Sequence, residues 1–229
     1  MDVNSLARRL MESKTGRMVT NAYLNSRWYQ EEFFFRSMWF LKSNSIQGDY
    51  LEFGCYEGAT FALAYKYMRL AKLNMRLFAF DSFRGYPKPV TSNVESSDLM
   101  ELNAVSVERF KKILEKRGMK ATDYTIVPGF YAESLKEGPH KLGLQSAAFV
   151  YVDCVLYEST VPVLNFILPL LQTGTIIALD DFYCYKGDPE RGEQLAMKEF
   201  LQRNPQITLN DYLNIGWHGK SFIVKKSQQ

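Results

Sequence analysis

The sequence predicts an α/β fold, a doubly wound and mainly parallel sheet of seven strands with helices on both faces. From residue 49 onward, short apolar runs alternate with segments of helical periodicity, which is typical of parallel strands joined by helical crossovers. The connection between the last two apolar runs is too short for a crossover. We therefore expect the last strand to be antiparallel.

The expected elements follow in chain order. Two helical segments, 3–14 and 26–41, come first and predict an N-terminal helical cap over residues 1–48, followed by one main domain over residues 49–229. The expected strands are 50–54, 77–81, 125–128, 148–153, 175–180, 207–210 and 221–225. The expected helices between them are 60–73, 106–117, 159–171 and 192–203. The long polar segment 82–105 is expected to be a lid beside a site or a disordered insertion.

The segment 26–41 is unusually rich in aromatic side chains. Its Trp28, Phe33, Phe34, Phe35 and Trp39 are too many for a single apolar stripe on a helix. We expect this helix to pack against the sheet. A ligand cover or a subunit interface, and with it a homo-oligomer, is the alternative.

Composition limits the classes of partner. The net charge of +3 comes from 28 basic and 25 acidic residues without a basic stripe, which argues against a nucleic-acid partner. The first 20 residues lack the apolar region of a signal peptide, and the run 33–41 is interrupted by Arg36 and too short to span a bilayer. With Cys55, Cys154 and Cys184 expected as reduced thiols, we predict a cytoplasmic protein without a membrane partner.

Three acids end two of the predicted strands. Asp153 ends one apolar run, and Asp180 and Asp181 end the next, 27 positions later, which is about the length of one strand-helix-strand unit. Neighbouring parallel strands would bring the three carboxylates to one edge of the sheet, where they could bind a hard divalent cation. The alternative is that each acid only ends a strand in solvent.

A second pair of signals indicates an adenosine-containing cofactor. The run YLEFGCYEGAT places Gly54 and Gly58 between a strand and a helix, where the backbone can approach a ligand closely. Asp81 ends the next strand, 27 positions after Gly54, where an acid can accept hydrogen bonds from ribose hydroxyls. Tight turns also need glycine and acids, so each signal alone is weak.

At this point the chain resembles the class I S-adenosylmethionine-dependent methyltransferases, and more narrowly the macrocin O-methyltransferase family. The resemblance rests on LEFGCYEG, FDSFRGYP, VDCVLYEST and ALDDF, and on Gly192, Ala196 and Phe200 in the following helix. It implies a Rossmann-like methyltransferase fold, with residues 49–229 as the catalytic domain, and a bound S-adenosylmethionine.

The resemblance also implies residue roles. The cofactor would be bound by Glu52, Phe53, Gly54, Tyr56, Gly58, Asp81, Ser82, Gly129 and Phe130. Within that set Glu52, Gly54 and Gly58 would line the methionine side. Asp81 and Ser82 would bind the ribose, and Gly129 and Phe130 would lie near the adenine. An aromatic face at Tyr56 or Phe130 attracts the sulfonium cation. Mg²⁺ would be bound by Asp153, Asp180 and Asp181.

The expected function is therefore a magnesium-dependent O-methyltransferase acting on a small hydroxylated molecule, a sugar or other polyhydroxylated group of a natural product. Asp153 is the candidate base, whereas His140 and His218 lie outside the motifs and are expected at the surface. Val155 departs from the family, which usually has an acid at that position. The alternatives are a metal-dependent hydroxylase and a non-catalytic subunit that binds S-adenosylmethionine.

Overall fold

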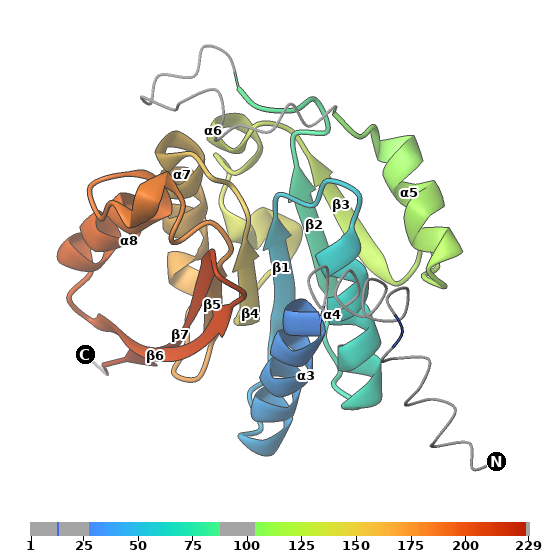
Figure 1. Ribbon diagram of the computed structural model, residues 1–229, viewed down its shortest axis with the longest axis horizontal. Helices are drawn as coiled ribbons and strands as arrows, with labels where there is room; N and C mark the ends of the chain where they lie inside the picture. The colour runs from blue at the N-terminus through green and yellow to red at the C-terminus, as the bar shows by residue number, and fades with distance from the viewer. Residues whose placement is uncertain (1–12, 14–27, 88–103, 228–229) are drawn as a thin grey trace.

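A seven-stranded sheet forms the centre of the protein, in the order β3-β2-β1-β4-β5-β7-β6 (Figure 1). The computed structural model describes residues 13, 28–87 and 104–227. Strands β1 to β5 are parallel, and β7 is antiparallel to both β5 and β6, so the predicted fold class and its antiparallel last strand are confirmed. The strands are β1 Asp49–Phe53, β2 Leu77–Asp81, β3 Tyr124–Pro128, β4 Ala147–Val152, β5 Ile176–Leu179, β6 Ile207–Ile215 and β7 Gly219–Lys226.

Helices connect the strands and follow the predicted order. They are α3 Trp28–Ser43, α4 Ala59–Leu70, α5 Val107–Lys116, α6 Tyr131–Ser134, α7 Tyr157–Ile167 and α8 Gly192–Arg203. Short 3-10 turns are η1 Pro139–Leu142, η2 Leu168–Leu170 and η3 Tyr185–Gly187. The helix expected at 3–14 and most of the segment 82–105 lie outside the described residues. No helix of the described ranges is long and apolar enough to cross a membrane.

Both faces of the sheet are covered, which explains why every residue of β1, β4 and β5 is buried. Side chains alternate along β1: Tyr50 packs in a core with α3, α4 and α5, whereas Leu51 and Phe53 pack in a second core with α7 and α8. Figure 1 shows these two helical layers on either side of the strands. Glu52 has the same parity as Tyr50 and so faces the first layer.

Helix α3 packs directly on the sheet, as expected. Phe33 and Phe34 are almost completely buried and contact the rings of Phe149 and Tyr151 on β4. The neighbouring Phe35 lies on the other side of α3 and remains 44% exposed. The aromatic excess of this helix is therefore divided between the core and the surface.

The β6–β7 hairpin is longer than the sequence suggested, because the strand expected at 207–210 continues to Ile215. Its turn is held against the end of β5. The Tyr183 N–H donates to the carbonyl oxygen of His218 (2.7 Å), and a Cβ on Gly219 would lie 2.8 Å from the carbonyl oxygen of Asp180. This close approach brings the turn to the edge of the sheet where the acids lie.

Candidate active site

The carboxyl ends of β1, β4 and β5 lie side by side. Phe53 is paired with Val152, and Val152 with Leu179. One residue further along, the Asp153 N–H donates to the Phe53 carbonyl and the Asp180 N–H to the Val152 carbonyl, both at 2.8 Å. The acids of the two strands thus reach one edge of the sheet, as their spacing predicted.

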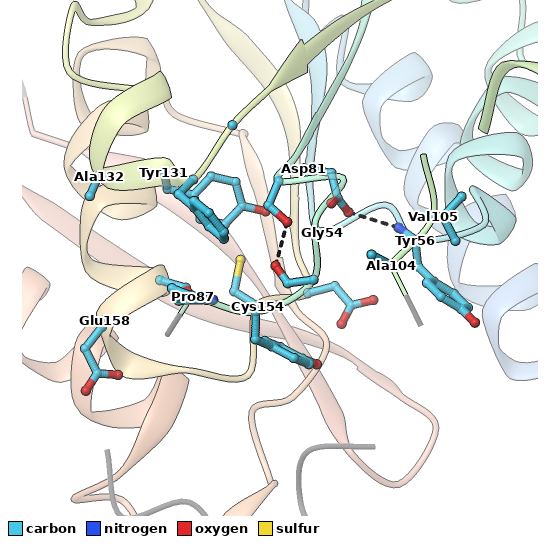
Figure 2. A pocket seen from close by; sticks show the side chains of 17 residues that line it. Gly54, Tyr56, Asp81, Pro87, Ala104, Val105, Tyr131, Ala132, Cys154 and Glu158 are labelled. Atoms are coloured by element: carbon cyan, nitrogen blue, oxygen red, sulfur yellow. Dashed lines mark hydrogen bonds between the residues drawn. The ribbon is translucent and has the colours of Figure 1, made fainter. Parts of the chain in front are cut away.

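A pocket of about 260 Å³ opens at this edge (Figure 2). Residues of α6 and α7, Ala132 and Glu158, line one side of it, and Tyr56, Ala104 and Val105 line the other. Seven of the residues predicted from the sequence lie in its wall: Gly54, Tyr56, Asp81, Ser82, Gly129, Phe130 and Asp153. The structure therefore brings six of the nine predicted cofactor residues and one predicted metal ligand into one pocket.

Three residues predicted to bind the cofactor are not in the pocket wall. Glu52 is fully buried, and its carboxyl group accepts hydrogen bonds from the hydroxyls of Tyr50 and Thr60, the latter at 2.8 Å. Phe53 is buried in the core on the α7 side, and Gly58 is the residue that precedes α4. Glu52 and Phe53 point to opposite faces of the sheet from within β1, and Gly58 lies beyond the turn at the start of α4, so none of the three lines the pocket.

Asp81 holds the turn that follows β1. Its Oδ2 accepts hydrogen bonds from the backbone N–H groups of Cys55 (2.8 Å) and Tyr56 (3.1 Å), and its Oδ1 accepts one from Phe83 (2.7 Å). The bond to Tyr56 is drawn in Figure 2. A carboxylate has about four acceptor positions, so Asp81 retains capacity for a ligand hydroxyl.

Gly54 lets β1 approach β4 at the edge of the pocket. Its φ is 88°, and a Cβ at this position would lie 1.9 Å from the carbonyl oxygen of Asp153. No side chain other than hydrogen fits there. The glycine of the predicted cofactor turn is therefore in direct contact with the backbone that carries the predicted metal ligand.

Four acids gather beside the pocket, one more than the sequence predicted. The fourth is Glu193 on α8, which is 1% exposed. Burial is the largest cause that raises the pKa of Asp153, followed by the charges of Asp180 and Asp181. Burial likewise raises the pKa of Asp180 to about 6, with Asp181 as the next cause. A cation bound here would relieve this repulsion.

The hydrogen bonds of these acids show which of their carboxylate oxygens could bind a cation. Asp180 Oδ1 accepts a hydrogen bond from the Tyr151 hydroxyl at 2.5 Å, and Asp181 Oδ1 accepts one from the Cys184 thiol at 3.2 Å. The buried Oδ2 of Asp181 has no hydrogen-bond partner within the described residues. Carboxylate oxygens of this kind fit the preference of Mg²⁺. Across the same ranges, no three His, Cys, Asp or Glu side chains are arranged so that they could hold a metal ion.

His218 is not at the surface, which corrects the expectation from the sequence. Its side chain is 14% exposed, and Nδ1 donates to the carbonyl oxygen of Asp180 at 2.6 Å. The opposite nitrogen, Nε2, lies 3.3 Å from the hydroxyl of Tyr29 on α3. The other histidine, His140, is exposed as expected. The β6–β7 hairpin folds His218 back onto β5, and only a tertiary contact could have revealed that position.

Two further residues beside the site were not assigned from the sequence. Tyr86, within the FDSFRGYP motif, lines the pocket, and burial followed by the charges of Asp153 and Asp181 raises its pKa. Glu193 directly follows Gly192, which was noted only for the family resemblance. Their position within or next to the sequence motifs is the only feature of the sequence that could have identified Tyr86 and Glu193 as site residues.

Comparison with known proteins extends these observations. The sequence pattern of the macrocin-O-methyltransferase (TylF) family matches residues 36–218. A tetracenomycin-type enzyme of Streptomyces olivaceus, the 8-demethyl-8-(2,3-dimethoxy-alpha-L-rhamnosyl)-tetracenomycin-C 4'-O-methyltransferase, is 24% identical over 147 residues, which cover 61% of this chain and 55% of that protein. The demethyldecarbamoylnovobiocin O-methyltransferase of Streptomyces niveus is 25% identical over 146 residues, 61% of this chain and 54% of that protein. The chain thus spans about half the length of these curated relatives.

Solved structures share the fold. The O-methyltransferase NovP superposes with a TM-score of 0.70 at 20% identity, covering 85% of this chain and 79% of that one. The calicheamicin methyltransferase CalS11 superposes with a TM-score of 0.62 at 23% identity, covering 96% of this chain and 90% of that one. Because the family pattern extends over most of the sequence, this chain belongs to the macrocin O-methyltransferase family.

Proposed function

We propose that this protein is an O-methyltransferase that moves a methyl group from S-adenosylmethionine to a hydroxyl of a small molecule, a sugar or other polyhydroxylated group of a natural product. The observation that carries the proposal is the shared pocket, in which Gly54, Asp81 and Gly129 lie in the same wall as Asp153. Family membership supports it, as do the names of the two Streptomyces relatives. Methyltransferases of the same fold have been solved with S-adenosylhomocysteine bound.

Methyl transfer from a sulfonium requires the acceptor oxygen, the methyl carbon and the sulfur to be in line. Positioning of this kind can contribute about 7 to 11 kcal/mol. In the proposed arrangement the turn at Gly54 and the aromatic ring of Tyr56 bind the methionine end, and the remaining acceptor capacity of Asp81 binds the ribose. The methyl group would then point toward Asp153.

The acid side of the pocket would prepare the acceptor hydroxyl. We propose that Asp153, Asp180 and Asp181 bind Mg²⁺ after their side chains rearrange, because among the described residues they do not yet form a three-ligand site. Mg²⁺ bound there would orient the acceptor hydroxyl and lower its pKa. Asp153 lines the pocket and is the candidate base, because it can lie beside both the cation and the acceptor hydroxyl. Tyr86 also lines the pocket and would help to exclude water from the reacting atoms.

The test compares Asp153→Asn with Asp188→Asn, a change of the same charge at an exposed acid beyond β5. Calorimetry measures binding of S-adenosylhomocysteine, and methyl transfer is assayed against a panel of hydroxylated acceptors with and without Mg²⁺. We expect Asp153→Asn to bind the cofactor product normally and to lose at least about 100-fold in kcat, because a positioned base contributes 10²–10⁴-fold. Asp188→Asn should match the wild type.

Each part of the proposal has its own contrary outcome. Full activity in excess chelator would remove the magnesium role and leave methyl transfer intact. Cofactor binding without transfer to any acceptor would favour the non-catalytic subunit. Absence of cofactor binding would overturn the proposed function as a whole.

A further inference from the structure

Glu193 forms a bridge between two turns that lie far apart in the sequence. Its Oε2 accepts a hydrogen bond from the backbone N–H of Asp181 at 3.0 Å, and its Oε1 accepts one from the backbone N–H of Cys154 at 3.4 Å. Cys154 directly follows Asp153 at the end of β4, and Asp181 follows Asp180 at the end of β5. One carboxylate thus contacts the backbone of both acid-bearing turns.

The start of α8 is fixed so that Glu193 cannot easily move away. Gly192 has a φ of 53°, and a Cβ there would lie 2.5 Å from the ring of Tyr185 and 3.1 Å from the carbonyl oxygen of Val155. The guanidinium of Arg191 lies over the same Tyr185 ring, 4.7 Å from its centroid. The helix therefore meets the β4 turn in van der Waals contact directly before Glu193.

A buried carboxylate at the start of α8 destabilises the folded protein unless it is hydrogen-bonded. Glu193 is 1% exposed, and burying a carboxylate is costly unless hydrogen bonds replace its contacts with water. The hydrogen bonds from the backbone N–H groups of Cys154 and Asp181 offset this cost of burial.

We propose that Glu193 is a positioning residue of this site, whose carboxylate bridges the β4 and β5 turns and so fixes the separation of the Asp153 and Asp181 carboxylates. This inference rests on the proposed function for its consequence, since the two acids are the proposed cation ligands. The bridge itself is a property of the folded chain and is measurable without any ligand.

The first experiment measures the bridge directly. Amide hydrogen exchange of the full chain is followed by NMR in Glu193→Ala, Glu193→Gln and the control Glu190→Gln, an exposed acid three residues earlier that pairs with Lys198. In Glu193→Ala we expect the amides of Cys154 and Asp181 to lose about tenfold or more of their protection relative to those of Val152 and Leu179 in the adjoining strands. Glu193→Gln retains one acceptor oxygen and should lose protection at one of the two amides.

The second experiment measures the consequence. Binding of Mn²⁺ alone is followed by electron paramagnetic resonance, and binding of S-adenosylhomocysteine by calorimetry. A residue that orients metal ligands typically changes metal affinity by about 10- to 100-fold when mutated, so Glu193→Gln should weaken Mn²⁺ binding to this extent. Binding of S-adenosylhomocysteine should stay within about twofold of the wild type, because the predicted cofactor residues Gly54, Asp81 and Gly129 lie at the ends of β1, β2 and β3 and not on the turns that Glu193 bridges.

The outcomes separate this inference from the proposed function. Unchanged protection of both amides in Glu193→Ala would overturn the bridge, whatever the metal result. Uniform loss of protection along β4 and β5 would reduce Glu193 to a general packing role and also overturn it. If the wild type binds no Mn²⁺ while the amide result is as expected, the bridge stands and the magnesium part of the proposed function fails. If Glu193→Ala does not fold, the single-amide effect in Glu193→Gln decides.

Discussion

Glu52 is an acid buried under the cofactor pocket rather than exposed in it. It alternates with Leu51 and Phe53 on β1 and so points into the layer that contains α3 and α4. Burial raises its pKa to about 8, although hydrogen bonds from Tyr50 and Thr60 offset part of the effect. At neutral pH the folded protein therefore keeps Glu52 largely protonated.

This protonation makes stability depend on pH. The pKa of Glu52 is raised from 4.5 to about 8, so the folded state binds a proton that the unfolded state has released. The stabilisation that comes from this proton is fully present below pH 4.5 and is lost as pH rises through 8. Between these values the free energy of unfolding falls by up to about 1.4 kcal/mol per pH unit. Glu52→Gln preserves the size and polarity of the side chain and should remove this slope.

The measurement is urea unfolding of the wild type and Glu52→Gln at several pH values between 5 and 8. Taking the difference between the two proteins cancels the titration of groups that do not interact with Glu52. Tyr50, Cys55 and Asp180 interact with Glu52, so their response to its removal forms part of the measured difference. We expect the variant to gain stability relative to the wild type as pH rises. A constant difference across this range would contradict a protonated Glu52.

The position of a site residue could be predicted from the sequence where the residue directly follows a recognisable strand. Asp153 and Asp180 follow apolar runs of parallel strands, and the ends of such strands necessarily share an edge. Glu193 and His218 could not be predicted in the same way. Each reaches the site through packing of an element distant in sequence, α8 or the β6–β7 hairpin, and no local pattern encodes such a contact.

The turn between β1 and α4 is the element that joins the two halves of the pocket. Its first residue, Gly54, lies against the backbone of Asp153, and the next two amides, of Cys55 and Tyr56, donate to Asp81. The conformation of this turn therefore affects both the predicted cofactor side and the acid side.

Gly54→Ala should be far more damaging than an alanine at a glycine that only needs positive φ. Gly118, after α5, provides the matched control, because its φ is 84° and a Cβ there would meet no atom within 4 Å. Gly118→Ala should cost about 1 to 2 kcal/mol, the usual penalty of the left-handed region. Gly54→Ala adds a clash with the Asp153 carbonyl and should exceed about 4 kcal/mol, the range that signals a specific steric defect.

Urea unfolding of both variants measures these costs, and calorimetry with S-adenosylhomocysteine shows whether the turn still binds the cofactor product. We expect Gly118→Ala to bind normally and Gly54→Ala to lose binding. Equal destabilisation by the two variants would mean that β1 and β4 can separate freely at this edge.

The boundaries of β4 were predicted well because both faces of this strand are buried. The run of β4 is apolar throughout, and its predicted range, 148–153, is within one residue of the observed Ala147–Val152. Strand β6 is an edge strand with exposed positions and an irregularity between Asp211 and Asn214, so its second half has no apolar run to mark it.

At the scale of the whole molecule, α3 belongs to the same core as the sheet. Phe34 is completely buried, and its ring lies 5.4 Å from that of Tyr151 and 5.7 Å from that of Phe149, both on β4 at the centre of the sheet. Tyr29, on the same helix, contacts His218 at the candidate active site through its hydroxyl group. We therefore expect α3 to unfold together with the main domain.

Neighbouring residues of α3 provide a matched test. Phe34→Ala should reduce the free energy of unfolding by about 3 to 5 kcal/mol, as is usual for a buried aromatic ring. Phe35→Ala removes a ring that is 44% exposed and mainly stacks on Trp39, so it should cost about 1 kcal/mol. Urea unfolding is followed by far-ultraviolet circular dichroism for the whole chain and by tryptophan fluorescence.

The three tryptophans make this comparison informative, because Trp28 and Trp39 lie on α3 and Trp217 lies in the β6–β7 turn. If α3 is part of one cooperative core, the fluorescence and dichroism transitions of Phe34→Ala shift together to lower urea. If residues 1–48 formed an independent cap, the fluorescence of α3 would change first and the remaining transition would stay at the wild-type midpoint. The contacts of Phe34 with the central strand favour the single shifted transition, since a helix that supplies the core of β4 cannot detach without exposing the rings of Phe149 and Tyr151.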